Sequence, residues 1–172
     1  MISRFRKNPF LPVNLLMAVL LTCVFFSRDL SAANEKKITD YKGVYLDLGG
    51  KKVKAATRGR VLFLNFWASW CAPCLFEIPV INRLKDKYGE KVDFVGISLD
   101  DMEPAKVGIF VRKYKIQYKV GVATKGLAEE FKVTSVPATF IFKADGGFHK
   151  RLDGPQKSEV FEAEILAALS GS

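Results

Sequence analysis

Cysteine and histidine are scarce in this 172-residue chain, which has three cysteines and one histidine. A structural zinc site usually takes four cysteine or histidine ligands, and an iron–sulfur cluster needs about four thiolates. Covalent haem attachment requires a histidine directly after a Cys-x-x-Cys motif, but Leu75 follows Cys71 and Cys74. A structural disulfide between two residues this close would stabilise the fold only slightly. The pair is therefore better suited to redox chemistry than to metal binding or a structural role.

The chain also lacks internal repeats, low-complexity segments and basic runs interleaved with aromatic residues. The formal net charge is +9, but the lysines and arginines are scattered along the sequence. This distribution indicates a solvated basic surface and argues against nucleic-acid binding. Attraction to anionic membrane lipids is the alternative interpretation.

The N-terminus has the features of an export signal. Basic residues at 4–7 precede an apolar stretch at 10–26, and the small residues at 31–33 suit cleavage. We predict a signal peptide at 1–33, with Cys23 as one of its apolar residues, and a single domain at 34–172. The apolar stretch is at the short limit for spanning a bilayer, so an uncleaved membrane anchor through residues 10–26 is the alternative. Either form places the domain in the periplasm or another extracytoplasmic space.

Cys71 and Cys74 lie where a predicted strand turns into a predicted helix. Residues 61–67 form an almost continuous apolar run, which is typical of a strand buried on both faces. Residues 75–88 carry apolar side chains at helical spacing. Cys71 would then lie at a helix N-terminus, where unpaired N–H groups and the macrodipole favour a thiolate. Pro73 fits the first helical turn, where its missing N–H is not needed.

Three motifs resemble one family. Residues 65–74, Asn-Phe-Trp-Ala-Ser-Trp-Cys-Ala-Pro-Cys, resemble the active-site segment of thioredoxin-like proteins, most closely the extracytoplasmic TlpA/ResA-type thiol-disulfide oxidoreductases. Pro79 matches the family's helix-kinking proline, and residues 136–140 match its cis-proline segment. The resemblance covers roughly residue 41 to the C-terminus. It implies an α/β, thioredoxin-like fold: a central mixed β-sheet flanked by helices, with an N-terminal β-hairpin and a central helix–strand insertion.

The sequence pattern is compatible with this fold, because strands and helices alternate along the chain. Gly49 and Gly50 predict the turn of the hairpin, and Ser158 is a candidate N-cap for the last helix. The expected strands are 44–48, 52–55, 61–67, 92–97, 117–122, 138–143 and 148–152, and the expected helices are 75–88, 104–114, 125–131 and 158–169.

The resemblance assigns roles to the redox residues. Cys71 would be the attacking thiolate and the more exposed cysteine, and Cys74 would resolve the mixed disulfide. Thioredoxin itself has a buried aspartate for proton transfer where this chain has Asn65, which cannot accept a proton. Glu77 lies three residues after Cys74, on the same helix face, so we predict that it acts as the general base. An ordinary solvated glutamate is the alternative.

Other residues are predicted to bind the substrate or to pack around the site. The Val136–Pro137 bond is expected to be cis, and the backbone of Val136 would pair with an extended substrate segment. Trp70 borders the redox pair. Trp67 is expected in the core, and His149 is expected to be a surface residue. The predicted substrate-binding residues are Trp70, Ala72, Pro73, Val136 and Pro137.

These observations predict an exported thiol-disulfide oxidoreductase without cofactor or metal. Its expected role is to reduce disulfides in exported proteins, such as apocytochrome c, and to receive electrons from a membrane thiol donor. A disulfide oxidase or isomerase is the alternative in the same class, because direction depends on the reduction potential. A periplasmic chaperone holding Cu(I) between Cys71 and Cys74 is the alternative from another class. It is less favoured, because neither Met102 nor His149 is adjacent to the pair in sequence.

Overall fold

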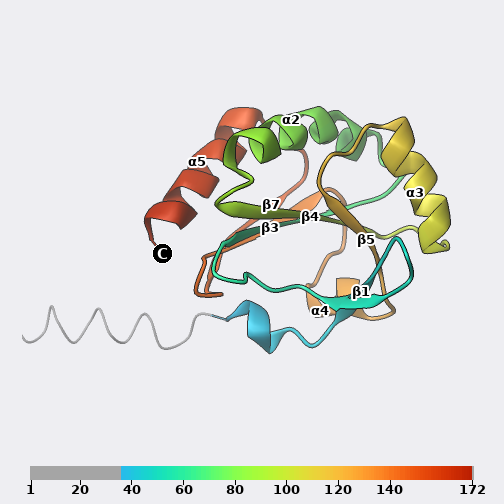
Figure 1. The fold of residues 1–172 in the computed structure, drawn as a ribbon, viewed down its shortest axis with the longest axis horizontal. Helices are drawn as coiled ribbons and strands as arrows, with labels where there is room; N and C mark the ends of the chain where they lie inside the picture. The colour runs from blue at the N-terminus through green and yellow to red at the C-terminus, as the bar shows by residue number, and fades with distance from the viewer. Residues whose placement is uncertain (1–35, 172) are drawn as a thin grey trace, which may run out of the picture. The chain divides into compact units, whose positions relative to one another are not determined.

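A seven-stranded mixed sheet forms the centre of the computed structural model, which describes residues 36–171. The predicted signal peptide or anchor lies outside the described residues. The strand order is β2-β1-β5-β4-β3-β6-β7 (Figure 1). The strands are β1 (Val44–Asp47), β2 (Lys52–Lys54), β3 (Val61–Trp67), β4 (Val92–Ser98), β5 (Lys119–Ala123), β6 (Ala138–Phe142) and β7 (Phe148–Asp153). The helices are the 3-10 helix η1 (Ile38–Asp40), α2 (Ala72–Tyr88), α3 (Pro104–Lys113), α4 (Leu127–Glu130) and α5 (Ser158–Ser170).

The strands at the centre of the sheet are buried along their whole length. β3 pairs in parallel with β4 and antiparallel with β6, and every residue of these three strands is buried. This is why their sequences are runs of apolar residues rather than alternating patterns. β4 continues in parallel to β5, and the predicted hairpin of β1 and β2 joins the sheet through β5. The predicted α/β fold class is confirmed.

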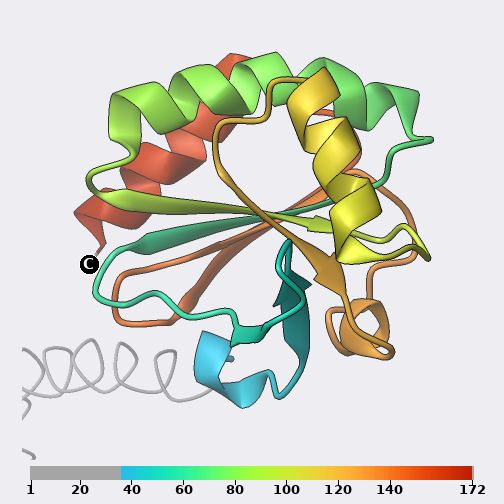
Figure 2. The same cartoon turned by 45° about the vertical axis from the view of Figure 1, so that its right-hand side comes forward.

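Helices cover both faces of the sheet, which divides the core into two parts (Figures 1 and 2). Alternate residues of β3 point to opposite faces. Phe63 and Trp67 pack with α2, α3 and α5, whereas Leu64 and Phe66 pack with η1 and α4 on the other face. Asn65 has the same parity as Phe63 and Trp67, so the strand directs this polar residue to the face that α2 covers.

The predicted elements differ from the observed ones mainly at their ends. α2 begins at Ala72 instead of residue 75, because Cys71 caps it and Pro73 lies in its first turn. The prediction that Ser158 caps α5 is wrong. The cap is Lys157, which has extended backbone angles, and Ser158 is already the first helical residue. Pro79 lies inside α2, where the family resemblance places it.

Between residues 36 and 171, no helix combines the length and the apolar character needed to cross a bilayer.

Candidate active site

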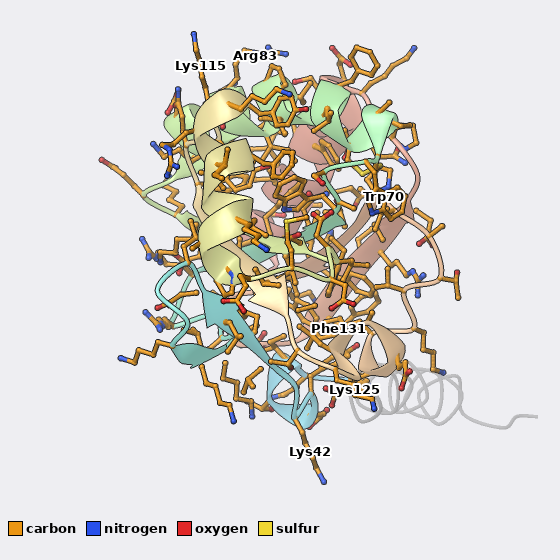
Figure 3. The ribbon with its side chains drawn as sticks, turned by 90° about the vertical axis from the view of Figure 1, so that its right-hand side faces the viewer. Lys42, Trp70, Arg83, Lys115, Lys125 and Phe131 are labelled. Carbon is orange, nitrogen blue, oxygen red and sulfur yellow. A yellow bond between two sulfur atoms is a disulfide. The ribbon has the colours of Figure 1, made fainter. Side chains whose placement is uncertain are left out.

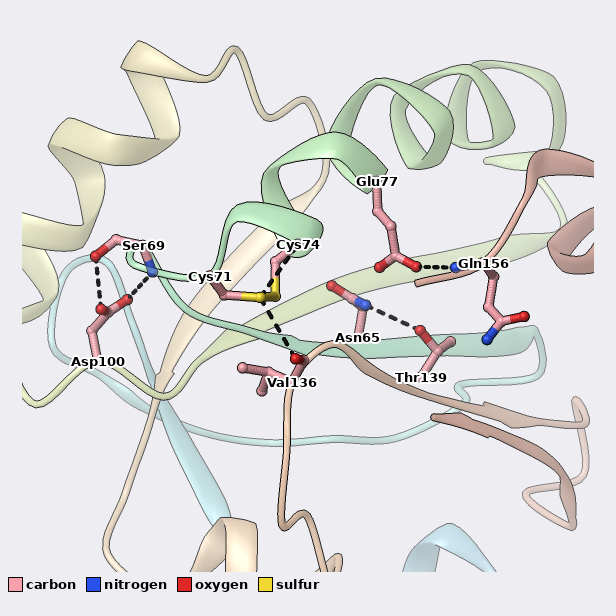
Figure 4. Close-up of a disulfide and its surroundings, with 9 residues drawn as sticks. All are labelled: Asn65, Ser69, Cys71, Cys74, Glu77, Asp100, Val136, Thr139 and Gln156. Atoms are coloured by element: carbon pink, nitrogen blue, oxygen red, sulfur yellow. Dashed lines mark hydrogen bonds between the residues drawn. A yellow bond between two sulfur atoms is a disulfide. The ribbon is translucent and has the colours of Figure 1, made fainter. Parts of the chain in front are cut away.

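A disulfide joins Cys71 and Cys74 at the junction of β3 and α2 (Figure 4). Cys71 is the N-cap of α2, and its Sγ accepts a hydrogen bond from the Cys74 N–H at 3.2 Å. This N–H is one of those that a helix start leaves unpaired, so it can also stabilise a Cys71 thiolate in the reduced protein. Cys71 was expected to be the more exposed cysteine, but the difference is small: the two residues are 4% and 2% exposed.

The loop between β3 and Cys71 is held by a buried carboxylate. Asp100 follows β4, the parallel neighbour of β3, so the two strand ends meet at one edge of the sheet. Its carboxylate accepts hydrogen bonds from the N–H and the hydroxyl of Ser69, at 2.9 and 2.8 Å, and from the hydroxyl of Ser98 at 2.6 Å (Figure 4). These three donors satisfy a carboxylate that is almost fully buried. Asp100 therefore ties the position of the Cys71 loop to β4.

The segment before β6 meets the disulfide from the other side. The Val136–Pro137 bond is cis, as predicted. The carbonyl oxygen of Val136 lies 3.6 Å from Cys71 Sγ. A disulfide sulfur has no hydrogen to donate, so this is a contact in the oxidised protein, whereas the thiol of reduced Cys71 could donate to the same oxygen. The backbone of Val136 is therefore next to the redox pair, and its pairing with a substrate segment stays a prediction.

Glu77 lies one helical turn after Cys74 and is buried, with only 3% of its surface exposed. The solvated surface glutamate considered as an alternative is therefore excluded. Glu77 Oε1 accepts a hydrogen bond from the backbone N–H of Gln156 at 2.7 Å (Figure 4), and Oε2 has no partner among the described residues. Burial raises the pKa of Glu77 to about 7, although the backbone N–H of Gln156 and the neighbouring side-chain amide of Asn65 oppose the increase. Glu77 can therefore take up or release a proton near neutral pH.

Asn65 connects Glu77 to the sheet. Its side-chain amide donates a hydrogen bond to the hydroxyl of Thr139, on β6, at 3.0 Å. Figure 4 shows the Asn65 side chain between Thr139 and Glu77, to one side of the disulfide. Asn65 and Thr139 are both buried, so a line of polar groups crosses this part of the core. It ends at the carboxyl group of Glu77.

The structure brings most of the predicted site residues together. Val136 contacts the Cys71–Cys74 disulfide, and Glu77 lies one helical turn along α2 from Cys74, but the catalytic roles of these residues stay predictions. Trp70 is 73% exposed beside it, and Trp67 is buried in the core as predicted. Ala72 and Pro73 are exposed in the first turn of α2.

His149 lies apart from this group. It is half-buried rather than fully at the surface, and its Nε2 lies 3.0 Å from Glu164 Oε2 on α5. In residues 36–171, no group of three or more histidine, cysteine, aspartate or glutamate side chains is placed to hold a metal ion.

Sequence reasoning missed four residues that shape the site. Ser98 is the last residue of β4 and Asp100 lies two residues beyond it. The position of Asp100 just after a buried strand was the available signal for it. Thr139 is the second residue of β6, on the face shared with Asn65. Gln156 lies in the loop before α5, 79 residues from Glu77 in sequence, and it contributes only a backbone N–H. No side-chain pattern could have identified it.

Known proteins share both the sequence and the fold of this chain. The chain is 32% identical over 141 residues to the thiol-disulfide oxidoreductase ResA of Bacillus cereus, a match that covers 80% of each chain. It is 34% identical over 122 residues to ResA of Bacillus thuringiensis, covering 69% of this chain and 70% of that protein. A solved structure from Chlorobium tepidum, described as a thiol:disulfide interchange protein DsbE, superimposes with a TM-score of 0.69 at 27% identity. It covers 78% of this chain and 96% of its own.

These similarities agree with the geometry of the site. A Cys-x-x-Cys disulfide at a helix start, a cis-proline beside it and the ResA relatives all indicate thiol-disulfide exchange. The model of the Redoxin family matches residues 33–169. The chain therefore belongs to the Redoxin family, as a thioredoxin-like thiol-disulfide oxidoreductase of the TlpA/ResA type.

Proposed function

We propose that this oxidoreductase works outside the cytoplasm as a reductant of disulfides in exported proteins. The export signal predicted at residues 1–33 supports this location. The domain that would follow has only the cysteines of the redox pair. An exported protein without a structural disulfide, but with one redox pair, is suited to catalysis rather than to cross-linking.

The buried carboxyl group of Glu77 is the observation that carries the reducing direction. A strong oxidant such as DsbA owes its potential to a stabilised reduced form. Here the ionised form of Glu77 would place a negative charge one turn from Cys74, and like charges disfavour a thiolate. The reduced pair is then less stable relative to the disulfide, so the pair gives up its electrons more readily.

Glu77 also supplies the proton acceptor that is needed when Cys74 releases the client from the mixed disulfide. The Cys71 thiolate attacks a client disulfide, one client sulfur bonds to Cys71, and the other leaves as a thiolate. Glu77 then accepts the proton of Cys74, directly or through a water molecule. The Cys74 thiolate attacks Cys71 Sγ, and the client leaves with both sulfurs reduced. The two electrons have come from the pair, which is again the disulfide seen here. A membrane thiol donor would restore the dithiol.

The clients we propose are exported cysteine proteins, with the CxxCH segment of apocytochrome c as the leading candidate. The test is the equilibrium between the reduced full chain and an oxidised CxxCH peptide, with thiols counted by mass spectrometry after alkylation. We expect the reduced peptide and the oxidised protein to predominate.

The reverse mixture, oxidised protein with reduced peptide, provides the control and should change little. If the oxidised protein instead converts the peptide to its disulfide, the oxidase alternative holds and the reductant proposal fails.

A further inference from the structure

The start of α2 presents an apolar surface to solvent. Between residues 70 and 80, every exposed residue is apolar, and the single charged residue, Glu77, is buried. Phe76 is 80% exposed, more than Trp70. A helix at the surface of a globular domain normally shows the reverse pattern, with charged residues outward and apolar residues inward. We call Trp70, Ala72, Pro73, Phe76 and Pro79, together with the half-buried Val80, the apolar strip.

The strip begins beside the redox pair and ends before the next exposed charged residue of α2. Trp70 directly precedes Cys71, and Arg83 is the next exposed residue after the strip. Figure 3 shows Trp70 beside the start of α2 and Arg83 further along the same helix. An isolated exposed apolar side chain is ordinary, but a continuous series that leads away from a reactive disulfide indicates an interaction surface.

The size of the strip limits what can cover it. Trp70 and Phe76 together expose on the order of 300 Å² of apolar surface. A stable protein–protein interface buries about 800 Å² on each partner, more than twice the area of these two side chains, so the aromatic part of the strip is too small to hold a second copy of this chain permanently. A short peptide segment, held only while disulfides are exchanged, fits this area.

We propose that the apolar strip binds the client segment next to the cysteine that is joined to Cys71, and so selects clients with apolar residues there. This inference rests on the proposed function, because it names the substrate class of the same site. From Cys71 to Val80 the helix spans roughly 14 Å, which an extended chain covers in about four residues. The selected side chains therefore lie within about four residues of the client cysteine.

The test compares two disulfide peptides that differ only in the four residues after one cysteine, which are leucine and phenylalanine in one peptide and serine and glycine in the other. The rate constant for exchange with the full chain is measured for each, and their ratio is the readout. Burial of one aromatic ring against an apolar client residue corresponds to roughly a tenfold effect. We expect Phe76→Ser to lower the ratio about tenfold and Phe76→Leu to retain most of it.

Leu166→Ser is the matched control. Leu166 is 51% exposed on α5. It lies one turn after Glu162, whose carboxylate accepts a hydrogen bond from the hydroxyl of Tyr88 at the C-terminal end of α2. The C-terminal half of α5 lies away from the start of α2 in Figures 1 and 2. This variant removes a comparable exposed apolar side chain far from the redox pair, so it should leave the ratio unchanged.

Three outcomes would overturn the proposal: a wild-type ratio near one, a ratio that Phe76→Ser leaves unchanged, or one that Leu166→Ser lowers equally. Sedimentation with phosphatidylcholine–phosphatidylglycerol vesicles provides a further arm. If Phe76→Ser loses vesicle binding but keeps the peptide ratio, the strip serves a membrane surface instead.

The ratio of the two rate constants is measured both for reduced protein with oxidised peptides and for oxidised protein with reduced peptides. If the protein only oxidises peptides, yet reacts faster with the apolar one, the reductant role is contradicted but the proposal that the strip binds apolar client segments still holds.

Discussion

Replacing Cys71 with serine is expected to abolish reduction of protein and small-molecule disulfides, whereas Cys74→Ser is expected to accumulate mixed disulfides with clients. Serine at position 71 leaves no thiolate at the start of α2, where the N–H of Cys74 faces the attacking sulfur. Serine at position 74 leaves the attack intact but removes the thiol that releases the client. The measurement is turnover of insulin or a small disulfide, together with non-reducing electrophoresis of the trapped species.

The third cysteine requires a control. Cys23 lies in the predicted signal and could form adducts if the signal is retained, so both variants are compared in a Cys23→Ala background. Wild-type turnover by the Cys71 variant would show that the nucleophile is assigned wrongly. If mixed disulfides accumulate with the Cys71 variant but not with the Cys74 variant, the attacking and the resolving cysteine are exchanged.

Replacing Glu77 with glutamine is expected to stabilise the oxidised protein at alkaline pH. The pKa of Glu77 is raised from 4.5 to about 7 in the folded protein by burial. Below pH 4.5 the carboxyl is protonated in both the folded and the unfolded state. As pH rises toward 7, ionisation favours the unfolded state, so stability present at low pH is lost. The loss corresponds to roughly 3 kcal/mol at pH 8, and glutamine avoids it.

The measurement is urea unfolding of wild type and Glu77→Gln between pH 4 and pH 8, with the disulfide intact. We expect the free energy of unfolding of Glu77→Gln, relative to that of wild type, to increase by about 3 kcal/mol from pH 4 to pH 8. Glu90→Gln, at an exposed glutamate after α2, is the matched control and should run parallel to wild type. Parallel curves for Glu77→Gln as well would contradict the raised pKa.

The same variant tests the role of Glu77 as a base. Without the carboxyl, Cys74 must pass its proton to solvent, so the release step should slow and the pH dependence of thiol alkylation should change. Alkylation profiles that superimpose on those of wild type would mean that the buried carboxyl does not exchange protons with Cys74.

The predictable part of the structure is the part set by local pattern. The apolar run of β3, the helical spacing after Cys74 and the position of Pro73 predict a strand, a helix and a cysteine at the helix N-terminus. Each depends on neighbours in sequence, so each was found. Glu77 was predicted near Cys74 because three residues along a helix bring side chains to one face.

The remaining parts depend on contacts between distant segments. The burial of Glu77 requires the loop at Gln156, and the loop at Ser69 is fixed by Asp100, 31 residues away. The exposure of Phe76 was not predicted either, because helical spacing alone does not show which face of α2 the sheet covers. The cap of α5 was misplaced by one residue, since Ser158 and Lys157 differ in backbone conformation rather than in any sequence pattern.

The reduction potential of the Cys71–Cys74 pair tests the central claim most directly. It is measured by equilibrating the full chain with glutathione or dithiothreitol buffers and counting protein thiols. A reductant that gives electrons to client disulfides should have a potential near that of thioredoxin, about −270 mV. A value near about −120 mV, typical of strong oxidants such as DsbA, would contradict the reducing direction.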